Sequence, residues 1–213
     1  MDDDFSGVLG KTDSIDAFQR LMEKGVFKMM ETLTHLSNNE PSLLSEEVAQ
    51  ELAKLIAFPR IFPEHANAYM NAPEKEMSLK ELCNIHDYTL KALYRAAKEV
   101  YEHQQYEDAC DCFSVLTMID ANEPLFWLAL GNSKYFCRQY DAALTAYARV
   151  AYMNPFEPMC HVSSSKCYDE MGQTELAVNA LDLALLVIGD NKNHESLKLE
   201  VEKERKRILK KQL

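Results

Sequence analysis

The sequence predicts an all-α protein built as a helical solenoid, and three observations point to this fold class. First, proline and glycine are scarce, at 7 and 6 among 213 residues, so few helices are interrupted. Second, apolar residues recur at helical spacing in the segments that flank the centre of the chain. Third, one pattern of about 34 residues occurs three times in succession between residues 90 and 191.

The central copy of the pattern is the most complete. Counted from Pro124, Trp127 is position 4, Gly131 is position 8 and Tyr147 is position 24, which is the spacing of a tetratricopeptide repeat. This repeat is a helix–turn–helix unit. Because Gly131 has no side chain, we expect the second helix to approach the first closely there, with Ala143 as the small residue that meets it.

The same positions recur one period away on each side. Position 8 is Ala97 upstream and Ser165 downstream, and position 24 is Phe113 upstream and Leu181 downstream. The three starts leave no insertion between the copies, so each repeat can stack directly on the next. The sequence therefore predicts three tandem repeats, which span residues 90–123, 124–157 and 158–191.

The segment before the repeats, residues 1–77, is predicted to be a helical extension. Residues 15–33 carry apolar side chains at helical spacing, although Gly25 could divide this stretch into two short helices. We expect a second helix at about 44–58 and then a bend, because prolines follow. A further short helix is expected at 64–70.

The repeat region as a whole is predicted to span residues 78–192. The pattern Ser78-x-x-Glu81 is a capping box, and we expect the helix that it opens to run unbroken into the first repeat. A turn at Gly189 then precedes a charged final helix with a thin apolar stripe. A repeat array needs a polar outer cap, so residues 193–213 are predicted to be a C-terminal capping helix.

Composition and motifs exclude several classes of function. The net charge of -11 argues against nucleic-acid binding, which calls for a basic surface. The longest strongly apolar run, residues 181–188, is too short to span a bilayer, and the acidic N-terminus is not a signal peptide. We therefore expect a cytosolic protein that does not insert into membranes. No common catalytic motif is present, so we predict neither enzymatic activity nor a cofactor.

Cysteine and histidine offer little evidence for a metal site. Cys83 and His86 lie three residues apart on a predicted helix and could contact one ion. Two ligands do not complete a site, and nothing nearby in the sequence supplies the others. The six cysteines include no C-x-x-C pair, and a cytosolic setting keeps thiols reduced.

The inner face of the solenoid is the candidate binding surface. Positions 2, 5, 9 and 12 of each first helix share a stripe turned away from the second helix. Tyrosines beside leucine, methionine and valine would form a groove with apolar pockets and polar edges, which suits an extended peptide. The alternative is that flanking helices cover this face. The predicted peptide-binding residues are Tyr94, Lys98, Tyr101, Leu125, Leu128, Asn132, Tyr135, Phe136, Met159, Val162 and Lys166.

Several short motifs in the repeat region occur together in one known family. They are L-Y-x-x-A-x-x-x-Y at residues 93–101, Q-Y-E-D-A at 105–109, E-P at 123–124 and M-G at 171–172. With these motifs, residues 78–192 resemble the class II translocator chaperones of bacterial type III secretion systems. Lys24-Gly25, which precedes an apolar stretch, is similar to the N-terminal helix of that family.

The resemblance implies a chaperone of the bacterial cytoplasm whose groove binds an extended N-terminal segment of a pore-forming translocator before export. It also implies a homodimer formed through the N-terminal region. Two features depart from the family: Lys98 stands where an aromatic residue is common, and residues 38–77 look like an insertion. The insertion could extend the dimer contact or cover the groove. The alternative function is a generic tetratricopeptide-repeat adaptor in a cytosolic assembly.

Overall fold

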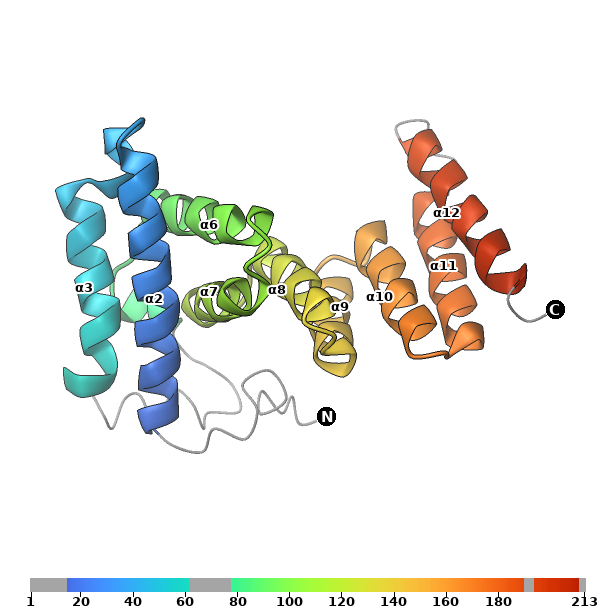
Figure 1. The fold of residues 1–213 in the computed structure, drawn as a ribbon, viewed down its shortest axis with the longest axis horizontal. Coiled ribbons are helices and arrows are strands. Elements are labelled where there is room, and N and C mark those ends of the chain that lie inside the picture. Colours follow the sequence, from blue (N-terminus) through green and yellow to red (C-terminus); the bar gives the residue numbers. More distant parts are fainter. Residues whose placement is uncertain (1–14, 62–77, 190–193, 211–213) are drawn as a thin grey trace.

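The computed structural model describes residues 15–61, 78–189 and 194–210. These residues contain helices and turns and no strand, so the all-α fold class is confirmed. Figure 1 shows the helices in an elongated row, with α2 and α3 at one end and α12 at the other. The elements are α2 (Ile15–Ser37), η1 (Pro41–Leu44), α3 (Glu46–Ile61), α5 (Leu79–Leu82), α6 (Asp87–Glu102), α7 (Tyr106–Ile119), α8 (Pro124–Phe136), α9 (Tyr140–Met153), α10 (Pro158–Glu170), α11 (Thr174–Ile188) and α12 (Glu195–Leu209).

Three helix pairs, α6 with α7, α8 with α9 and α10 with α11, form the tandem repeat. The turn inside each pair contains one residue in the left-handed region: Gln104 (φ 60°), Arg138 (φ 59°) and Gly172 (φ 71°). These residues stand 34 positions apart in the numbering, so the backbone reverses in the same way each time. Only the third turn uses glycine, which adopts this conformation without strain.

The first helices of the second and third repeats begin with the same device. Glu123 and Glu157 each precede the proline that opens the helix, and each carboxylate accepts a hydrogen bond from a backbone N–H two residues on. The donors are Leu125 at 3.1 Å and Met159 at 3.0 Å. Proline tolerates the first helical position because its missing N–H has no partner there. As predicted, α9 ends before Pro155.

The closest approach of α8 and α9 occurs at Gly131. A Cβ atom at this position would lie only 2.4 Å from Cε1 of Tyr147, and its three nearest neighbours all belong to that ring. The nearest neighbour of Gly131 on α9 is therefore the Tyr147 ring, and Ala143, which we expect to meet Gly131, is fully buried. The Tyr147 ring is buried, and its hydroxyl donates a hydrogen bond of 2.9 Å to Oδ1 of Asn132.

The helix that opens at Ser78 does not continue into the first repeat, so that prediction is wrong. The capping box itself is present: the Ser78 hydroxyl accepts from the Glu81 N–H, and the Glu81 carboxylate accepts from the Ser78 N–H. The helix ends after one turn, because Asn84 adopts a left-handed conformation at φ 51°. Asparagine is one of the few residues that tolerate this conformation. A new helix, α6, then begins at Asp87.

Gly25 does not divide α2, which is one continuous helix. A Cβ atom at position 25 would lie 2.7 Å from Cγ2 of Val115 and 2.8 Å from the backbone oxygen of Asp111. The glycine therefore lets α2 lie directly against α7. Glycine lowers the stability of a helix, and the packing of α2 against α7 offsets this loss.

Two expectations about residues 44–70 have different outcomes. The helix expected at 44–58 is present as α3, but it continues to Ile61 instead of bending at Phe58. Pro59 therefore lies in the last turn of α3 and does not end it. The short helix expected at 64–70 lies outside the described residues.

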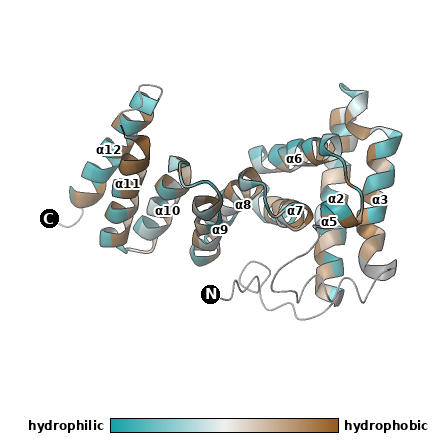
Figure 2. Cartoon of the chain, turned by 180° about the vertical axis from the view of Figure 1, so that it is seen from behind, coloured by the Kyte–Doolittle hydropathy of each residue, from teal (hydrophilic) through white to brown (hydrophobic). Residues whose placement is uncertain are grey.

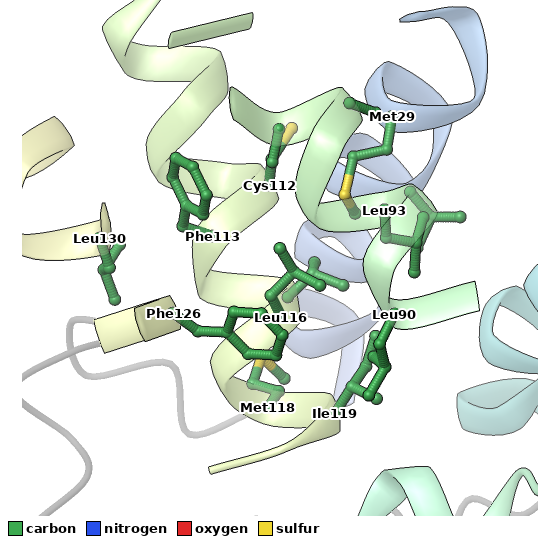
Figure 3. Packing of buried hydrophobic residues seen from close by; sticks show 14 of the residues in the cluster. Met29, Leu90, Leu93, Cys112, Phe113, Leu116, Met118, Ile119, Phe126 and Leu130 are labelled. Atoms are coloured by element: carbon green, nitrogen blue, oxygen red, sulfur yellow. The ribbon is translucent and has the colours of Figure 1, made fainter. Parts of the chain in front are cut away.

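One continuous core joins the N-terminal helices to the first two repeats. In Figure 3, Met29 of α2 lies with Leu93 of α6 and with Cys112 and Leu116 of α7, and all four side chains are buried. The same cluster extends through α8 and α9 to Cys167 in α10. Because α2 shares this core, it is part of the folded unit. A role of residues 1–77 in dimerisation remains a prediction.

A second, smaller core lies at the C-terminal end. Val201 and Ile208 of α12 are buried against α11, which Figure 2 shows as one of the most apolar helices. Two charged pairs bind α12 to the third repeat: Arg205 to Asp182 at 2.5 Å and Arg207 to Asp169 at 2.6 Å. The remainder of α12 is mainly polar, which suits the end of a repeat array.

A buried carboxylate joins α3 to the start of α6. Glu51 is only 4% exposed, and it accepts hydrogen bonds from the His86 N–H at 3.0 Å and from the Tyr88 hydroxyl at 2.9 Å. Burial by itself raises the pKa of Glu51. Interactions with the His86 backbone, the Thr89 hydroxyl, the His86 ring and Tyr88, in that order of size, outweigh burial and lower the pKa from 4.5 to about 2.

We predict that Gly131→Ala lowers the free energy of unfolding by about 1–3 kcal/mol, because the new methyl group would overlap the Tyr147 ring. Adding Tyr147→Leu should recover part of this loss, since serine and leucine already occupy these positions in the third repeat. Urea unfolding followed by circular dichroism measures the free energy of unfolding of the wild type, the two single variants and the double variant. In a control double variant, the losses of unfolding free energy caused by Gly131→Ala and by Leu197→Ala should simply add. Wild-type stability of Gly131→Ala would place the close approach elsewhere.

We predict that Glu51→Gln lowers stability at pH 7 by about 2 kcal/mol, after allowance for partial screening. The folded pKa lies below the ordinary value, so the ionised carboxylate stabilises the fold above about pH 4.5. This contribution disappears as the pH falls towards 2. The difference between wild type and Glu51→Gln should therefore be full at pH 6–7, less than half of that at pH 3 and small near pH 2 in urea titrations. Exposed Glu46→Gln is the control, and a difference independent of pH would contradict this role.

Candidate functional site

The first helices of repeats one and two border a hollow of about 510 Å³. Two of the predicted binding residues, Tyr94 of α6 and Leu125 of α8, line it together. Leu125 is 45% exposed, which is high for a leucine beside a core. The other residues around the hollow are apolar Leu90 and Phe126 and charged Lys80, Asp87, Lys91, Asp120 and Glu123. The site therefore combines apolar walls with a charged rim.

Tyr94 belongs partly to the core and partly to this hollow. Its ring stacks on Phe126 with centroids 5.8 Å apart and lies tilted against Phe113 at 6.0 Å. Burial raises the pKa of its hydroxyl, which is therefore neutral at physiological pH. Two aromatic neighbours fix the orientation of the ring, so a ligand meets a wall that is already formed.

Five aromatic residues form a second feature at the turns of repeats one and two, the aromatic cluster. Tyr106 stacks on Phe136 with centroids 4.5 Å apart and planes 11° apart. Tyr101 meets the edges of both rings, at 5.4 Å and 5.9 Å. Tyr135 joins Phe136 to Tyr140 at 5.3 Å and 5.8 Å. Three predicted residues, Tyr101, Tyr135 and Phe136, thus lie together.

The sequence pattern missed Tyr106 and Tyr140 as members of this cluster. Both occupy position 17, at the start of the second helix of their repeat. The predicted binding residues all lie on the first helices. The signal was nevertheless present, since tyrosine recurs at the same position in two successive repeats. A turn brings the start of one helix beside the end of the preceding helix, so position 17 adjoins position 12.

Three predicted residues support the fold more than they line a surface. Asn132 accepts the hydrogen bond of the buried Tyr147 hydroxyl. Val162 is 9% exposed and belongs to the C-terminal core, and Leu128 is half-buried against the central core. Their place on the first helices follows the predicted register, but little of each side chain faces solvent.

Three other predicted residues are exposed on the first helices. Lys98 lies 3.3 Å from the Glu102 carboxylate, one turn further along α6. Met159 stands at the start of α10, beside the N-cap Glu157, and Lys166 lies two turns further on. Met159 and Lys166 therefore extend the mixed apolar and charged character of the hollow towards the third repeat.

Lys80 holds the short helix α5 at the rim of the hollow. Its ammonium lies 2.7 Å from Asp87 of α6 and 3.3 Å from Asp120, which follows α7. The hydrogen bond to Asp87 contributes most to a raised pKa for Lys80, so the lysine remains charged. This bridge places one positive charge between two of the three carboxylates on the rim, Asp87 and Asp120.

The pair Cys83 and His86 does not lie on one helix. Cys83 ends α5 and His86 precedes α6, and the His86 ring is held 2.6 Å from Glu51. Within the described residues, no three histidine, cysteine or carboxylate side chains are grouped so that they could hold a metal ion. None of the helices described here combines the length and apolarity that crossing a bilayer requires.

The described part of the predicted insertion packs away from the hollow. Both η1 and α3 lie against α2, and η1 also touches α6, where the Arg95 guanidinium pairs with the Glu40 carboxylate. A separate apolar hollow of about 530 Å³ lies between α3 and α5, bordered by Phe58, Leu82 and Cys83 among others. The contacts of η1 and α3 with α2 extend the N-terminal helical layer.

Comparison with known proteins assigns the chain to a family. No family model matches it. It is 32% identical to the low calcium response locus protein H of Yersinia pestis over 120 residues. These aligned residues are 56% of this chain and 71% of that protein. The structure of the type III secretion translocator chaperone SycD of Yersinia enterocolitica superposes on this chain with a TM-score of 0.59 and 28% identity. The match covers 62% of this chain and 99% of the SycD chain. The chain belongs to the type III secretion translocator chaperones.

Two further structures of this chaperone family bear on the site. SycD in complex with a peptide of the translocator YopD is 29% identical, covers 61% of this chain and 98% of its own, and has a TM-score of 0.56. An alternative dimer of SycD is 31% identical, covers 61% and 98%, and has a TM-score of 0.57. The family is one of chaperones, which points to a protein without catalytic activity. The resemblance noted from the sequence motifs is thus confirmed.

Proposed function

We propose that this chain is a cytosolic chaperone that binds an extended segment of a type III secretion translocator. The segment would lie along the first helices of the three repeats, and binding would keep the translocator soluble until export. The observation that carries this proposal is the hollow between α6 and α8, where a half-exposed leucine faces a fixed tyrosine. The complex of the relative SycD with a YopD peptide supports it.

The geometry suits an extended ligand with apolar side chains at intervals. Leu125, Phe136 and Met159 are exposed on rigid helices, and each would gain from being covered. The rings of Tyr94 and Tyr101 are already held by neighbouring aromatics, so binding freezes few torsions. The rim charges of the hollow can accept hydrogen bonds from, or donate them to, the ligand backbone.

A passive chaperone of this kind needs no source of energy. A translocator must later enter a membrane, so it carries apolar segments that associate in water when they are exposed. A preformed site that binds such a segment shifts the equilibrium away from aggregation by mass action alone. The net charge of -11 on the chaperone would keep the complex dispersed.

In the free state we propose a homodimer through the N-terminal region. Phe27 on α2 is 56% exposed, although its helix is otherwise packed on the core of the first repeat. An exposed aromatic residue on a rigid helix is a common anchor of protein interfaces. A structure of the relative SycD is described as a dimer, which supports the dimeric state; the N-terminal interface rests on Phe27.

We predict that Leu125→Asp weakens binding of a peptide from the N-terminal segment of the cognate translocator by roughly tenfold to a hundredfold. Loss of an anchor costs on the order of 2 kcal/mol, and each 1.4 kcal/mol is tenfold. The melting temperature should hardly change, because Leu125 is half-exposed. Calorimetric titration and thermal melts measure the two effects. Tyr94→Ala is less informative, since that ring also packs in the core.

The matched control is Tyr152→Asp, which places the same charge on a side chain 80% exposed on α9, a second helix. It should bind the peptide as wild type does. Co-expression then separates a chaperone from a generic adaptor: wild type should render an otherwise insoluble translocator soluble, and Leu125→Asp should not. Equal loss of affinity in both variants, or no loss in Leu125→Asp, would contradict the proposed site.

For the dimer, we predict that Phe27→Asp shifts the free protein towards monomer in sedimentation velocity without loss of helicity. A point change is preferable to removal of residues 1–77, because α2 shares the core of the first repeat. Leu199→Asp, at a site 63% exposed on α12, is the control and should sediment as wild type. An unchanged dimer in Phe27→Asp would place the interface elsewhere.

A further inference from the structure

Two cysteines from different repeats meet beside the aromatic cluster. The Sγ atoms of Cys110 and Cys137 lie 3.8 Å apart, although the residues are 27 positions apart in the chain. Cys110 belongs to α7 in the first repeat, and Cys137 directly follows α8 in the second. Both cysteines are free thiols in this structure.

We propose that Cys110 and Cys137 are a covalent modification site, at which a mild disulfide oxidant forms a reversible bond that fixes the first repeat to the second. This inference does not depend on the proposed function. Cys110 and Cys137 stand 27 positions apart, so only the fold brings their thiols together.

The positions of the two sulfurs favour an intramolecular bond. A disulfide requires sulfurs about 2.05 Å apart, so the Cys137 side chain would have to rotate about its Cα–Cβ bond to bring its sulfur from 3.8 Å into bonding distance. Cys137 is the one that can rotate more easily, because it follows the last residue of α8 and is only partly buried. Cys110 is fixed within α7 and buried, so its sulfur is a stationary target.

The different surroundings of the two thiols set the order of the reaction. Cys137 is partly exposed and can meet a small oxidant from solvent. Burial raises the pKa of Cys110 to about 12, with the nearby Lys134 ammonium acting in the opposite direction. Cys110 is therefore a poor first nucleophile and becomes effective only when a sulfur is presented to it at close range.

With glutathione disulfide as oxidant, the exchange is balanced. The Cys137 thiolate, its proton released to water, attacks one sulfur of glutathione disulfide and expels one glutathione thiolate. Cys110 then loses its proton as it attacks the Cys137 sulfur, which forms the new S–S bond and expels the second glutathione. The two protein thiols lose two electrons and two protons, and two molecules of glutathione are formed.

The bond would restrain the junction between two repeats. Phe136 adjoins Cys137, and Tyr106 lies one turn before Cys110; their rings stack at 4.5 Å. In a repeat array each unit contacts only its neighbours, so the angle between repeats sets the shape of the inner face. A covalent link at this junction also restricts the unfolded chain by closing a loop.

The test uses the full-length protein treated with glutathione disulfide, followed by quenching of free thiols and mass spectrometry under non-reducing conditions. We expect the loss of two hydrogens per chain and no retained glutathione. Asp111 separates Cys110 from Cys112, so a protease that cleaves before aspartate identifies which thiol is joined to Cys137. The oxidised protein should melt roughly 5–10 °C higher, and dithiothreitol should reverse the shift.

Variants make the outcome decisive. Cys137→Ala removes the accessible thiol, so neither the bond nor the rise in melting temperature should appear. Cys83→Ala removes a buried thiol elsewhere and should behave as wild type. A stable glutathione adduct on Cys137, a bond to Cys112 or a bond between two chains would each overturn the proposal. Mass and melting need no client, so they remain valid whatever the translocator experiments show.

Discussion

The contact between Gly131 and the Tyr147 ring is the constraint on which the inner face depends. A side chain at 131 would overlap that ring, so only glycine lets α9 lie at this distance from α8. The Tyr147 hydroxyl reaches across to Asn132, one residue further along α8. Leu125 lies two turns before Asn132 on the same stripe of α8, and Phe136 ends the helix, so the contact orients both surfaces of the proposed groove.

The two ends of the array are closed in different ways. At the N-terminal end, α2 covers α7, where Gly25 allows contact with Val115 and where Lys24 and Lys28 pair with Asp111 and Asp108. At the C-terminal end, α12 buries only a thin apolar stripe and is held by charged pairs. An array without closed ends would expose apolar surface at each terminus. The extensive burial at α2 makes the N-terminal helix part of the core, whereas α12 is a cap.

The repeat period predicted most of the fold because it encodes local and next-neighbour contacts. The helix pairs, the proline starts and the polar final helix all follow from it. The break at Asn84 was missed, because a capping box marks where a helix begins and says nothing about its length. The role of Gly25 was missed as well, since Asp111 and Val115, which it lies against, are 86 and 90 positions away in the chain and a lone glycine in a helix looks like a weakness. In the candidate site, the repeat register predicted Tyr94 and Leu125, which line the same hollow. It did not predict Tyr106 as a member of the aromatic cluster.

The inner face joins stability to recognition through shared side chains. Tyr94 is at once a wall of the hollow and a neighbour of the core residues Phe113 and Phe126. Such a ring cannot move aside for a ligand without loss of core packing, so the site is preformed and selects ligands by shape. The exposed Leu125, by contrast, can change without disturbing the core. In the proposed groove, we therefore expect affinity for different clients to be adjusted at the exposed Leu125 and Met159, while Tyr94 and Tyr101 keep its shape constant.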